Sequence, residues 1–381
     1  EPKGVRIRFR NVSANAAAMA ERSRVTPEDA MLCFLPLFHD FGFFSGIVMP
    51  FVWDIPTWLY PTESFVRRPS FWLKALSRTG ATLCPAPQFV YEVALSHVRD
   101  RELEGVDLSA WRISYNGGEP IHAATVAAFN ARFAPWGLAP TVVLPSYGMA
   151  ESTLATAIHP PGTSTIVDRV SREALATERV ARAAGAGERA LEVVSCGPPL
   201  AGIDLTVLDD GGRERAEREV GEIALRGESI ADAYVLAGGE TRELVRDGWF
   251  RTGDLGYVAG GHVYVTGRVK DVIIRGGRNY YPQDVERAIG ALDGVRLNGA
   301  VAFGVLDEET GHERVVAVVE RDTSNEEVLA SLPDQARRAV FDALGLMLDE
   351  VAIERRGWIP KTTSAKLQRG RARERYLAER G

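Results

Sequence analysis

The sequence predicts an α/β protein whose large domain combines layered α/β subdomains with a β-rich subdomain, followed by a small, mobile α+β C-terminal domain. Between residues 32 and 144, strand-like runs alternate with amphipathic helical runs, which is typical of a mainly parallel sheet covered by helices. From residue 195 onward the apolar runs are short and strand-like. A chain of 381 residues is long enough for two or three domains with cores of their own.

Composition narrows the class of protein. Hydrophobic residues make up 45% of the chain, charged residues 25%, and the formal net charge is −6, which argues against a general nucleic-acid binder. The longest apolar run, residues 41–53, is too short to span a membrane. The three cysteines, Cys33, Cys84 and Cys196, lie far apart without metal-type spacing. We therefore expect reduced thiols in a cytoplasmic protein.

The elements of the first half follow from apolar periodicity and from the residues that interrupt it. A helical pattern covers residues 11–24, and an apolar, aromatic stretch covers residues 43–58. The remaining pattern predicts strands over residues 32–36, 82–85, 111–115 and 142–144, and helices over residues 71–79, 87–99 and 121–133. The aromatic stretch suits either a core or the walls of a pocket for a long apolar ligand.

Polar, glycine-bearing loops follow two of these strands. Ligands of such sheets bind outside the carboxyl ends of the strands, and glycine lets a backbone approach a flat ligand closely. A tyrosine ring in the second loop can stack on that ligand, and the carboxylate of Glu151 is a hard oxygen ligand suited to Mg²⁺. The loop residues are Asn116, Gly117, Gly118 and Glu119 after the first strand, and Ser146, Tyr147, Gly148 and Met149 after the second.

His39 follows the strand at residues 32–36 and precedes Phe41, Phe43 and Phe44. A histidine at this place can line the mouth of a pocket, although a histidine that only satisfies its neighbours is the commoner case. The three aromatic rings are candidates for the wall of an acyl pocket.

The middle of the chain predicts an insertion and then the β-rich subdomain. From residue 159 to residue 190 the pattern dissolves into Pro, Gly, Ala and mixed charges, so we expect irregular structure with at most a short helix over residues 172–184. Strands are predicted over residues 204–208 and 220–226.

Residues 251–286 predict a boundary between two folded units. The run predicts, in order, a hairpin over residues 255–266, a charged break at residues 267–271, a strand over residues 272–274 and a helix that begins at Pro282. Asp254, Arg268 and Lys270 crowd the break. We expect a hinge beside polar binding groups.

Beyond the break the pattern predicts a compact α+β unit. It consists of strands over residues 300–306, 314–320 and 350–354, a turn around Gly311, a helix over residues 324–346 interrupted by Pro333, and a very basic helix over residues 367–380. The predicted domains are therefore residues 1–269, with an insertion at 160–190 and a β-rich part at 195–269, and residues 270–381.

Lysine is scarce in this chain. Only five of the 45 basic residues are lysines, namely Lys3, Lys74, Lys270, Lys361 and Lys366. Because a surface cation here is arginine by default, a lysine in a loop is a candidate for a place that needs a compact, mobile ammonium.

Several motifs in order resemble the acyl-adenylate-forming superfamily, which includes acyl-CoA synthetases, adenylation domains and luciferases. The likeness is greatest to the fatty acyl-AMP ligases and covers essentially the whole chain. The motifs are PKGV at residues 2–5, then LPLFHDFG, NGGEP, SYGMAEST, RTGDLGY, GRVKD and PKTTSAK. The ligase branch is indicated by FHDFG, NGGEP, SCGPPLAG, GRNYYPQDVE and the insertion, which in ligases is thought to limit the swing of the small domain.

The resemblance implies ATP and Mg²⁺ as cofactors and a role for each motif residue. Residues 116–119 and 146–149 would border the nucleotide, with Asp254 on the ribose hydroxyls and Arg268 on the ribose or phosphate. Glu151 would hold Mg²⁺, and His39 would lie between the acyl tunnel and the α-phosphate. Lys366 would bridge the carboxylate and the nucleotide, because a positioned ammonium offsets the repulsion between two anions. Lys270 would be the hinge that reorients the small domain.

Two departures from the family pattern stand out. Ala365 occupies the place of the family's usual glycine, and alanine does not tolerate positive φ. The chain begins at what resembles the end of the phosphate loop, whose backbone N–H groups cradle the triphosphate. We therefore expect these 381 residues by themselves to adenylate poorly.

The resemblance implies activation of a fatty or similarly apolar acid to acyl-AMP, followed by transfer to the phosphopantetheine thiol of an acyl carrier protein. The basic residues Arg369, Arg371, Arg373 and Arg375 would face such an acidic carrier, or belong to a solvated helix. Alternatives are an acyl-CoA synthetase and an adenylation domain for an aryl or unusual acid. A non-catalytic remnant that binds an acyl group or a nucleotide is the alternative of another class.

Overall fold

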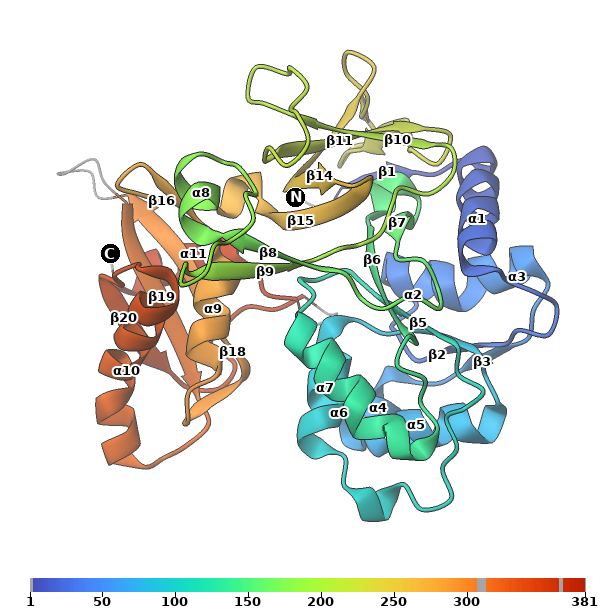
Figure 1. Ribbon diagram of the computed structural model, residues 1–381, viewed down its shortest axis with the longest axis horizontal. Coiled ribbons are helices and arrows are strands. Elements are labelled where there is room, and N and C mark those ends of the chain that lie inside the picture. Colours follow the sequence, from blue (N-terminus) through green and yellow to red (C-terminus); the bar gives the residue numbers. More distant parts are fainter. Residues whose placement is uncertain (1–2, 307–312, 363–365, 381) are drawn as a thin grey trace. The chain divides into compact units, whose positions relative to one another are not determined.

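The computed structural model describes residues 3–306, 313–362 and 366–380. The chain divides into two compact units, which are drawn together in Figure 1. Unit 1 consists of Glu1–Asp168, Glu192–Thr252 and Gly256–Val265, and unit 2 of Arg169–Leu191, Gly253–Leu255 and Thr266–Gly381. Contacts thus group residues 169–191 and 266–269 with the C-terminal residues. Contact grouping does not by itself define a domain along the chain, so the boundary at residues 269 and 270 stays a prediction.

Unit 1 contains a six-stranded sheet in the order β3-β2-β4-β5-β6-β7. Neighbours from β3 to β6 are parallel, and only β7 runs antiparallel to β6. The strands are β2 (Met31–Cys33), β3 (Thr57–Leu59), β4 (Leu83–Pro85), β5 (Ile113–Asn116), β6 (Val143–Gly148) and β7 (Ala155–Ile158). The predicted mainly parallel sheet is confirmed.

Alternate residues of these strands pack into two different cores, as the period of two in a strand requires. Met31 and Leu144 face a core that includes Met19 of α1 (Phe9–Ser23). Leu32 and Val143 face a second core built largely from α4 to α7, which lie together on one side of the sheet in Figure 1. These helices are α4 (Thr62–Arg67), α5 (Ser70–Thr79), α6 (Gln88–His97) and α7 (Ala123–Phe133). Three-residue 3₁₀ turns are η2 (Asp100–Glu102), η3 (Ala134–Trp136) and η4 (Ala150–Ser152).

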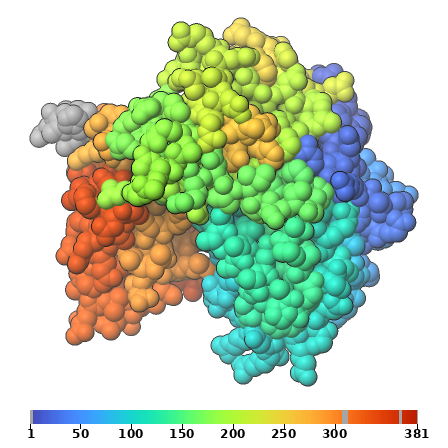
Figure 2. Space-filling view, in the orientation of Figure 1, coloured from blue at the N-terminus to red at the C-terminus, as the bar shows by residue number. Residues whose placement is uncertain are grey.

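The aromatic stretch at residues 43–58 forms a short helical run and an edge strand. The run consists of α2 (Asp40–Phe43), the π-helix η1 (Phe44–Val48) and α3 (Met49–Trp53), and β3 follows it. Several of its large apolar side chains are exposed, Phe51 to 85%. In Figure 2 blue residues from this N-terminal part of unit 1 reach the surface.

The β-rich part predicted after residue 195 is confirmed. A four-stranded sheet has the order β10-β11-β14-β15, and a three-stranded sheet the order β1-β12-β13. The predicted hairpin is β14–β15, and its turn residues Gly260 and Gly261 have the positive φ that glycine permits. The strands are β1 (Gly4–Arg6), β10 (Ile203–Leu208), β11 (Gly221–Gly227), β12 (Ala233–Val235), β13 (Thr241–Glu243), β14 (Phe250–Ala259) and β15 (His262–Arg268).

The predicted irregularity of residues 159–190 is wrong. This segment contributes β8 (Val167–Ser171), and a two-stranded sheet joins β8 to β9 (Ala190–Val194). The short helix predicted within residues 172–184 is confirmed in its first part as α8 (Arg172–Thr177), which begins where the Ser171 hydroxyl accepts a hydrogen bond from the N–H of Ala174. A polar, glycine-rich pattern does not predict strands. β8 and β9 are stabilised by pairing with each other across α8 and the residues that follow it.

The C-terminal part of unit 2 has a three-stranded sheet in the order β18-β19-β20. Here β18 and β19 are antiparallel, and β19 and β20 are parallel. The elements are η5 (Val269–Asp271), β16 (Ile273–Arg275), β17 (Arg278–Tyr280), α9 (Pro282–Gly290), β18 (Val295–Leu306), β19 (Glu313–Arg321), α10 (Glu326–Leu344), β20 (Glu350–Glu354) and α11 (Arg369–Arg380). The predicted turn at Gly311 lies outside the described residues.

Helix α10 continues through Pro333, so the predicted interruption is wrong. A proline removes one backbone hydrogen bond, but the buried side chains of Leu332, Ala336 and Val340 keep this face of the helix on the core. Within the described ranges no helix is long and apolar enough to cross a membrane.

Candidate functional site

The two glycine-bearing loops lie side by side at the carboxyl ends of β5 and β6. Asn116 is the register partner of Pro145 in the parallel pair. A Cβ on Gly117 would come within 2.8 Å of the Ser146 carbonyl oxygen, and Gly118 has φ 83°. A Cβ at position 117 would clash at this distance, and glycine adopts a positive φ more readily than any other residue. The structure therefore brings together the loop residues that the sequence predicted as one site.

Two polar residues of the first loop make internal contacts. Asn116 is fully buried, and its amide nitrogen donates to Gln88 Oε1 at 3.0 Å. Glu119 Oε1 accepts a hydrogen bond of 2.9 Å from the N–H of Phe89, in the first turn of α6. A carboxylate is favoured at a helix N-terminus. These side chains fix the loop to α6. They therefore have a structural role in addition to the predicted binding role.

Ser146, Tyr147 and Gly148 belong to β6, so the prediction that this strand ends at residue 144 is wrong: pairing with β7 extends the strand through residues predicted to form a loop. A Cβ on Gly148 would lie 1.9 Å from the Leu154 carbonyl oxygen, at the irregular step of this pair. Close strand packing therefore requires this glycine, a reason that the sequence did not reveal. Tyr147 is buried, Met149 packs partly buried against the same core, and Ser146 donates to the Leu144 carbonyl oxygen at 3.0 Å.

Glu151 lies just after this loop, in contact with Tyr234 of β12. The Tyr234 hydroxyl donates to Glu151 Oε1 at 2.6 Å. Burial, together with the neighbouring carboxylate, raises the pKa of Tyr234, so the phenol keeps its proton for this bond. Two residues after Glu151, the buried Thr153 has φ 70° and donates to the Ser229 carbonyl oxygen. A β-branched residue at positive φ is uncommon, and such strain concentrates at functional sites.

A magnesium ion at Glu151 would need ligands beyond this carboxylate. Within residues 3–306, 313–362 and 366–380 there is no group of three His, Cys, Asp or Glu side chains placed to hold a metal. Mg²⁺ is often bound by one or two carboxylates together with substrate phosphates. A single carboxylate oriented by a tyrosine therefore fits a magnesium ion that arrives with a nucleotide.

His39 caps α2, and its Nδ1 lies 2.7 Å from Asp40 Oδ1 and 3.2 Å from the N–H of Phe41. The three predicted acyl-pocket rings differ in burial. Phe44 is buried, Phe41 is partly buried, and Phe43 is exposed. The rings of Phe43 and Phe44 meet edge-on, with centroids 5.7 Å apart.

Asp254 and Arg268, predicted to bind the same nucleotide, form an ion pair in unit 2. Arg268 Nε donates to Asp254 Oδ1 at 2.9 Å. The aspartate side chain is only 8% exposed, whereas the arginine side chain is 57% exposed. The arginine can therefore change partner at low cost, while the aspartate stays in place.

The two predicted functional lysines differ in environment. Lys270 is exposed in η5. Lys366 is half-buried, its N–H donates to Thr362 Oγ1 at 3.0 Å, and its carbonyl oxygen accepts from the N–H of Thr362 at 2.8 Å. Ala365, where the family pattern differs, lies outside the described residues.

The predicted exposure of the basic C-terminal residues is wrong for Arg369. Its side chain is 18% exposed and pairs with Asp271 and Glu286. Arg371, Arg373 and Arg375 are exposed. The pairs Tyr234–Glu151 and Arg369–Glu286 join residues more than eighty positions apart, so periodicity and motif spacing offered no signal for them.

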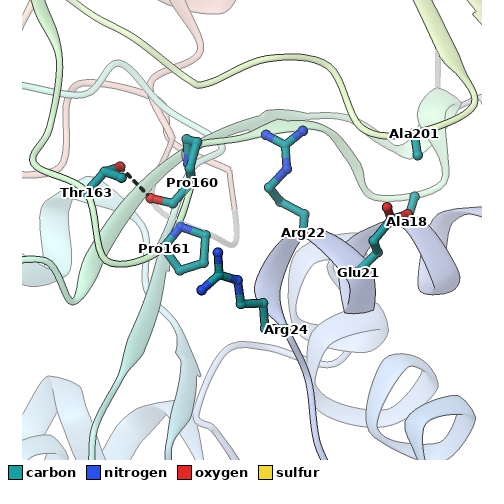
Figure 3. Close-up of a pocket in the computed structure, with 8 residues that line it drawn as sticks. All are labelled: Ala18, Glu21, Arg22, Arg24, Pro160, Pro161, Thr163 and Ala201. Carbon is teal, nitrogen blue, oxygen red and sulfur yellow. Dashed lines mark hydrogen bonds between the residues drawn. The ribbon is translucent and has the colours of Figure 1, made fainter.

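A cavity of about 290 Å³ in unit 1 lies at the C-terminal end of α1. Its lining residues are drawn in Figure 3: Ala18, Glu21, Arg22, Arg24, Pro160, Pro161, Thr163 and Ala201. None is a predicted site residue. The Arg22 guanidinium donates to three carbonyl oxygens, of Ile158, Pro198 and Pro199, so it joins α1 to the two proline-bearing loops.

Comparison with known proteins gives consistent matches. The profile of the family described as AMP-binding enzyme matches residues 1–235. The chain is 33% identical over 390 residues to the medium-chain-fatty-acid–[acyl-carrier-protein] ligase JamA of Moorena producens, covering 99% of this chain and 66% of that protein. It is also 33% identical over 401 residues to the long-chain-fatty-acid–AMP ligase FadD26 of Mycobacterium marinum, covering 99% of this chain and 68% of that protein.

Solved structures agree with these relatives. A structure from a study of fatty acyl-adenylate ligases from E. coli and L. pneumophila matches with TM-score 0.92 and 31% identity, over 99% of this chain and 68% of that one. The L. pneumophila fatty acyl-adenylate ligase in complex with acyl adenylate and pyrophosphate matches with TM-score 0.69 and 27% identity, over 99% and 67% of the two chains. The chain spans about two thirds of the length of these proteins.

Proposed function

The chain belongs to the AMP-binding enzyme family, and we propose that it activates a fatty or similarly apolar carboxylic acid with ATP. The products are acyl-AMP and pyrophosphate. The phosphopantetheine thiol of an acyl carrier protein then attacks the acyl carbon, a thioester forms, the bond from the acyl carbon to the phosphate oxygen breaks, and AMP leaves. The observation that carries the proposal is the meeting of the two predicted nucleotide loops, where Gly117 abuts the Ser146 carbonyl. The names of the matched relatives, a fatty acid–carrier-protein ligase and a fatty acid–AMP ligase, support the substrate and the acceptor.

In the proposed first step, a carboxylate oxygen of the acid attacks the α-phosphorus of ATP. The new bond is carboxyl oxygen to phosphorus, the bond from this phosphorus to the β,γ-phosphates breaks, and pyrophosphate leaves. Two anions must approach each other, so a positioned ammonium lowers the barrier. Lys366 takes this role, and His39 borders the reacting groups.

The remaining residues hold the nucleotide. Asp254 is buried and oriented by Arg268, which suits a carboxylate that accepts hydrogen bonds from the ribose hydroxyls. Tyr147 stacks on the adenine. Glu151 holds a magnesium ion, which supplies positive charge for the phosphates when it is bound.

Acyl-AMP binding provides a test that needs no turnover. The probe is a series of non-hydrolysable acyl-AMP analogues of graded chain length, titrated into the chain by calorimetry. We expect tighter binding as the acyl chain lengthens, since each buried CH₂ contributes about 0.8 kcal/mol. Asp254→Asn should weaken binding of every analogue by about tenfold, because it replaces charge-assisted hydrogen bonds. Absence of binding by all analogues would sink the proposal.

The acceptor is tested separately with synthetic acyl-AMP. Transfer to a phosphopantetheinylated carrier protein should exceed transfer to free CoA at equal thiol concentration. Faster transfer to CoA would instead identify an acyl-CoA synthetase, and binding without any transfer would identify a non-catalytic protein.

A further inference from the structure

Arg369, at the first position of α11, lies in a partly desolvated ionic cluster within unit 2. Its Nε and Nη2 donate to the two oxygens of Glu286 at 2.8 and 2.7 Å, and its Nη1 donates to Asp271 Oδ2 at 3.2 Å. The side chains of Arg369, Asp271 and Glu286 are 18, 16 and 9% exposed. One guanidinium therefore joins η5, α9 and α11.

The electrostatics make this junction stiff. Burial by itself lowers the pKa of Arg369, but the hydrogen bonds and charges of Glu286 and Asp271 outweigh it and raise the pKa above the ordinary arginine value. A bidentate arginine–carboxylate pair fixes orientation as well as distance. Glu286 Oε1 also accepts from the N–H of Ala302 in β18 at 3.1 Å, so the cluster is anchored to the sheet.

The backbone between Lys366 and Arg369 has little freedom. The N–H of Lys366 donates to Thr362 Oγ1, and the carbonyl oxygen of Lys366 accepts from the N–H of Thr362. Leu367 forms a bridge with Lys361, and the N–H of Gln368 donates to the Pro360 carbonyl oxygen at 3.0 Å. Arg369 follows directly. The place of Lys366 thus depends on Thr362 on one side and on the Arg369 cluster on the other.

Asp271 directly follows Lys270, the proposed hinge. We infer that Arg369 is a positioning residue for Lys366. It couples the lysine-bearing segment to the first residue beyond the hinge, so that a backbone rotation at Lys270 moves Lys366 together with that residue. This inference rests on the proposed function. It gives Arg369 a part in the proposed reaction, which it plays by positioning Lys366. The adenylation step, which needs the ammonium within bonding reach, depends on Arg369. The repulsion between carboxylate and phosphate that this ammonium offsets arises only in adenylation, so the inference assigns it no role in thiol transfer from preformed acyl-AMP.

The two half-reactions separate a positioning role from a purely structural one. Acid-dependent ATP–pyrophosphate exchange reports adenylation, and transfer from supplied acyl-AMP to carrier thiol reports the second step. Arg369→Gln should lower exchange by about 100-fold, the effect of a misplaced catalytic group, and transfer by less than about threefold. Arg369→Lys should recover part of the exchange, because an ammonium keeps the charge but loses the bidentate geometry.

Arg369→Gln leaves the buried carboxylate of Glu286 and the partly buried carboxylate of Asp271 without this cation and can prevent folding. Asp271→Asn is therefore the second variant, since it keeps the shape and the Glu286–Arg369 pair. It should lower exchange by about tenfold, the loss of one charge-assisted hydrogen bond. Arg337→Gln is the matched control: Arg337 is paired with Asp334 on the exposed face of α10, and exchange should stay at the wild-type rate.

Three outcomes overturn the inference: unchanged exchange in both Asp271→Asn and Arg369→Gln, an equal loss of both half-reactions, or transfer lost while exchange persists. Wild-type protein without either half-reaction would instead contradict the proposed function. Amide hydrogen exchange at Lys366 then tests the coupling alone. The hydrogen-exchange rate of the Lys366 amide should be at least about threefold higher in Asp271→Asn than in Arg337→Gln. Equal hydrogen-exchange rates in the two variants would overturn the coupling.

Discussion

Tyr234 is the side chain that orients the Glu151 carboxylate. Its hydroxyl donates to Glu151 Oε1, and its ring lies 5.1 Å from the Lys3 ammonium and 5.5 Å from the Arg242 guanidinium. Cations over a tyrosine ring are attracted to its face. One tyrosine thus orients a carboxylate and gathers positive charge beside it, a useful combination where a nucleotide polyphosphate and a metal ion are proposed to bind.

Removal of this hydroxyl should weaken metal use. For Tyr234→Phe, the Mg²⁺ concentration that gives half-maximal ATP–pyrophosphate exchange should rise by about tenfold, as for loss of other groups that orient metal ligands. Tyr257→Phe is the control, because the Tyr257 hydroxyl donates to a different carboxylate, Asp168, at 2.8 Å. The prediction fails if both variants, or neither, shift the Mg²⁺ dependence.

Among the elements, β1 is held to β12 by charge as well as by its ladder. Arg6 and Arg8 both donate to the Asp232 carboxylate, with Nε to oxygen distances of 3.0 and 2.7 Å. The hydrogen bond from Arg6, only partly opposed by burial and assisted by Arg8, lowers the pKa of Asp232 to about 2. Because β1 begins at Gly4, inside the PKGV motif at residues 2–5, this ion cluster fixes where that segment enters the fold.

The lowered pKa predicts a pH dependence of stability. A carboxyl whose pKa is lower in the folded state stabilises the fold above its ordinary pKa, and this contribution is lost as the pH falls toward the folded value. For Asp232 the loss should occur between about 3.8 and about 2. The thermal midpoint of the wild type should therefore fall more steeply over this range than that of Asp232→Asn.

The control for this measurement is Asp204→Asn. Asp204 pairs with Arg226, but both side chains are more than half exposed, and exposed pairs contribute little. Its pH profile should match the wild type. Parallel profiles for wild type and Asp232→Asn would contradict the role assigned to the cluster on β1.

For the whole molecule, we predict two orientations of the residues beyond Lys270, the proposed hinge. This lysine is exposed in η5, next to Asp271 of the Arg369 cluster. A hinge works by a change of φ and ψ at a few residues, and a stiff segment after the hinge transmits that change over a distance.

Lys270→Pro should separate the two half-reactions. Proline fixes φ near −65°, so one orientation is lost and either exchange or thiol transfer should fall by at least about tenfold more than the other. Lys270→Ala removes the same side chain but keeps the backbone free, and should retain both. Equal losses in Lys270→Pro, or a selective loss in Lys270→Ala, would count against the hinge.

Local pattern alone was sufficient for much of this molecule. The alternation of strands and helices up to residue 144, the hairpin β14–β15 and the start of α9 at Pro282 are as predicted, because each depends on periodicity or on turn residues within a few positions. The glycine-bearing loops were also predicted, and the parallel pairing of β5 with β6 brings them together. Parallel strands present their carboxyl ends at one edge, so this meeting follows from topology.

Tertiary structure decided the rest. The strands β8 and β9 exist because they pair with each other, and α10 passes Pro333 because its apolar face is buried. Gly148 is required by the Leu154 carbonyl, and Arg369 is withdrawn from the surface by Asp271 and Glu286. Side-chain partners distant in sequence leave no trace in periodicity, because the energy of such contacts depends on distance in space and not along the chain. The sequence alone thus determined which chemical groups are present and most of the elements that carry them, and folding decided the remaining elements and which groups lie in contact.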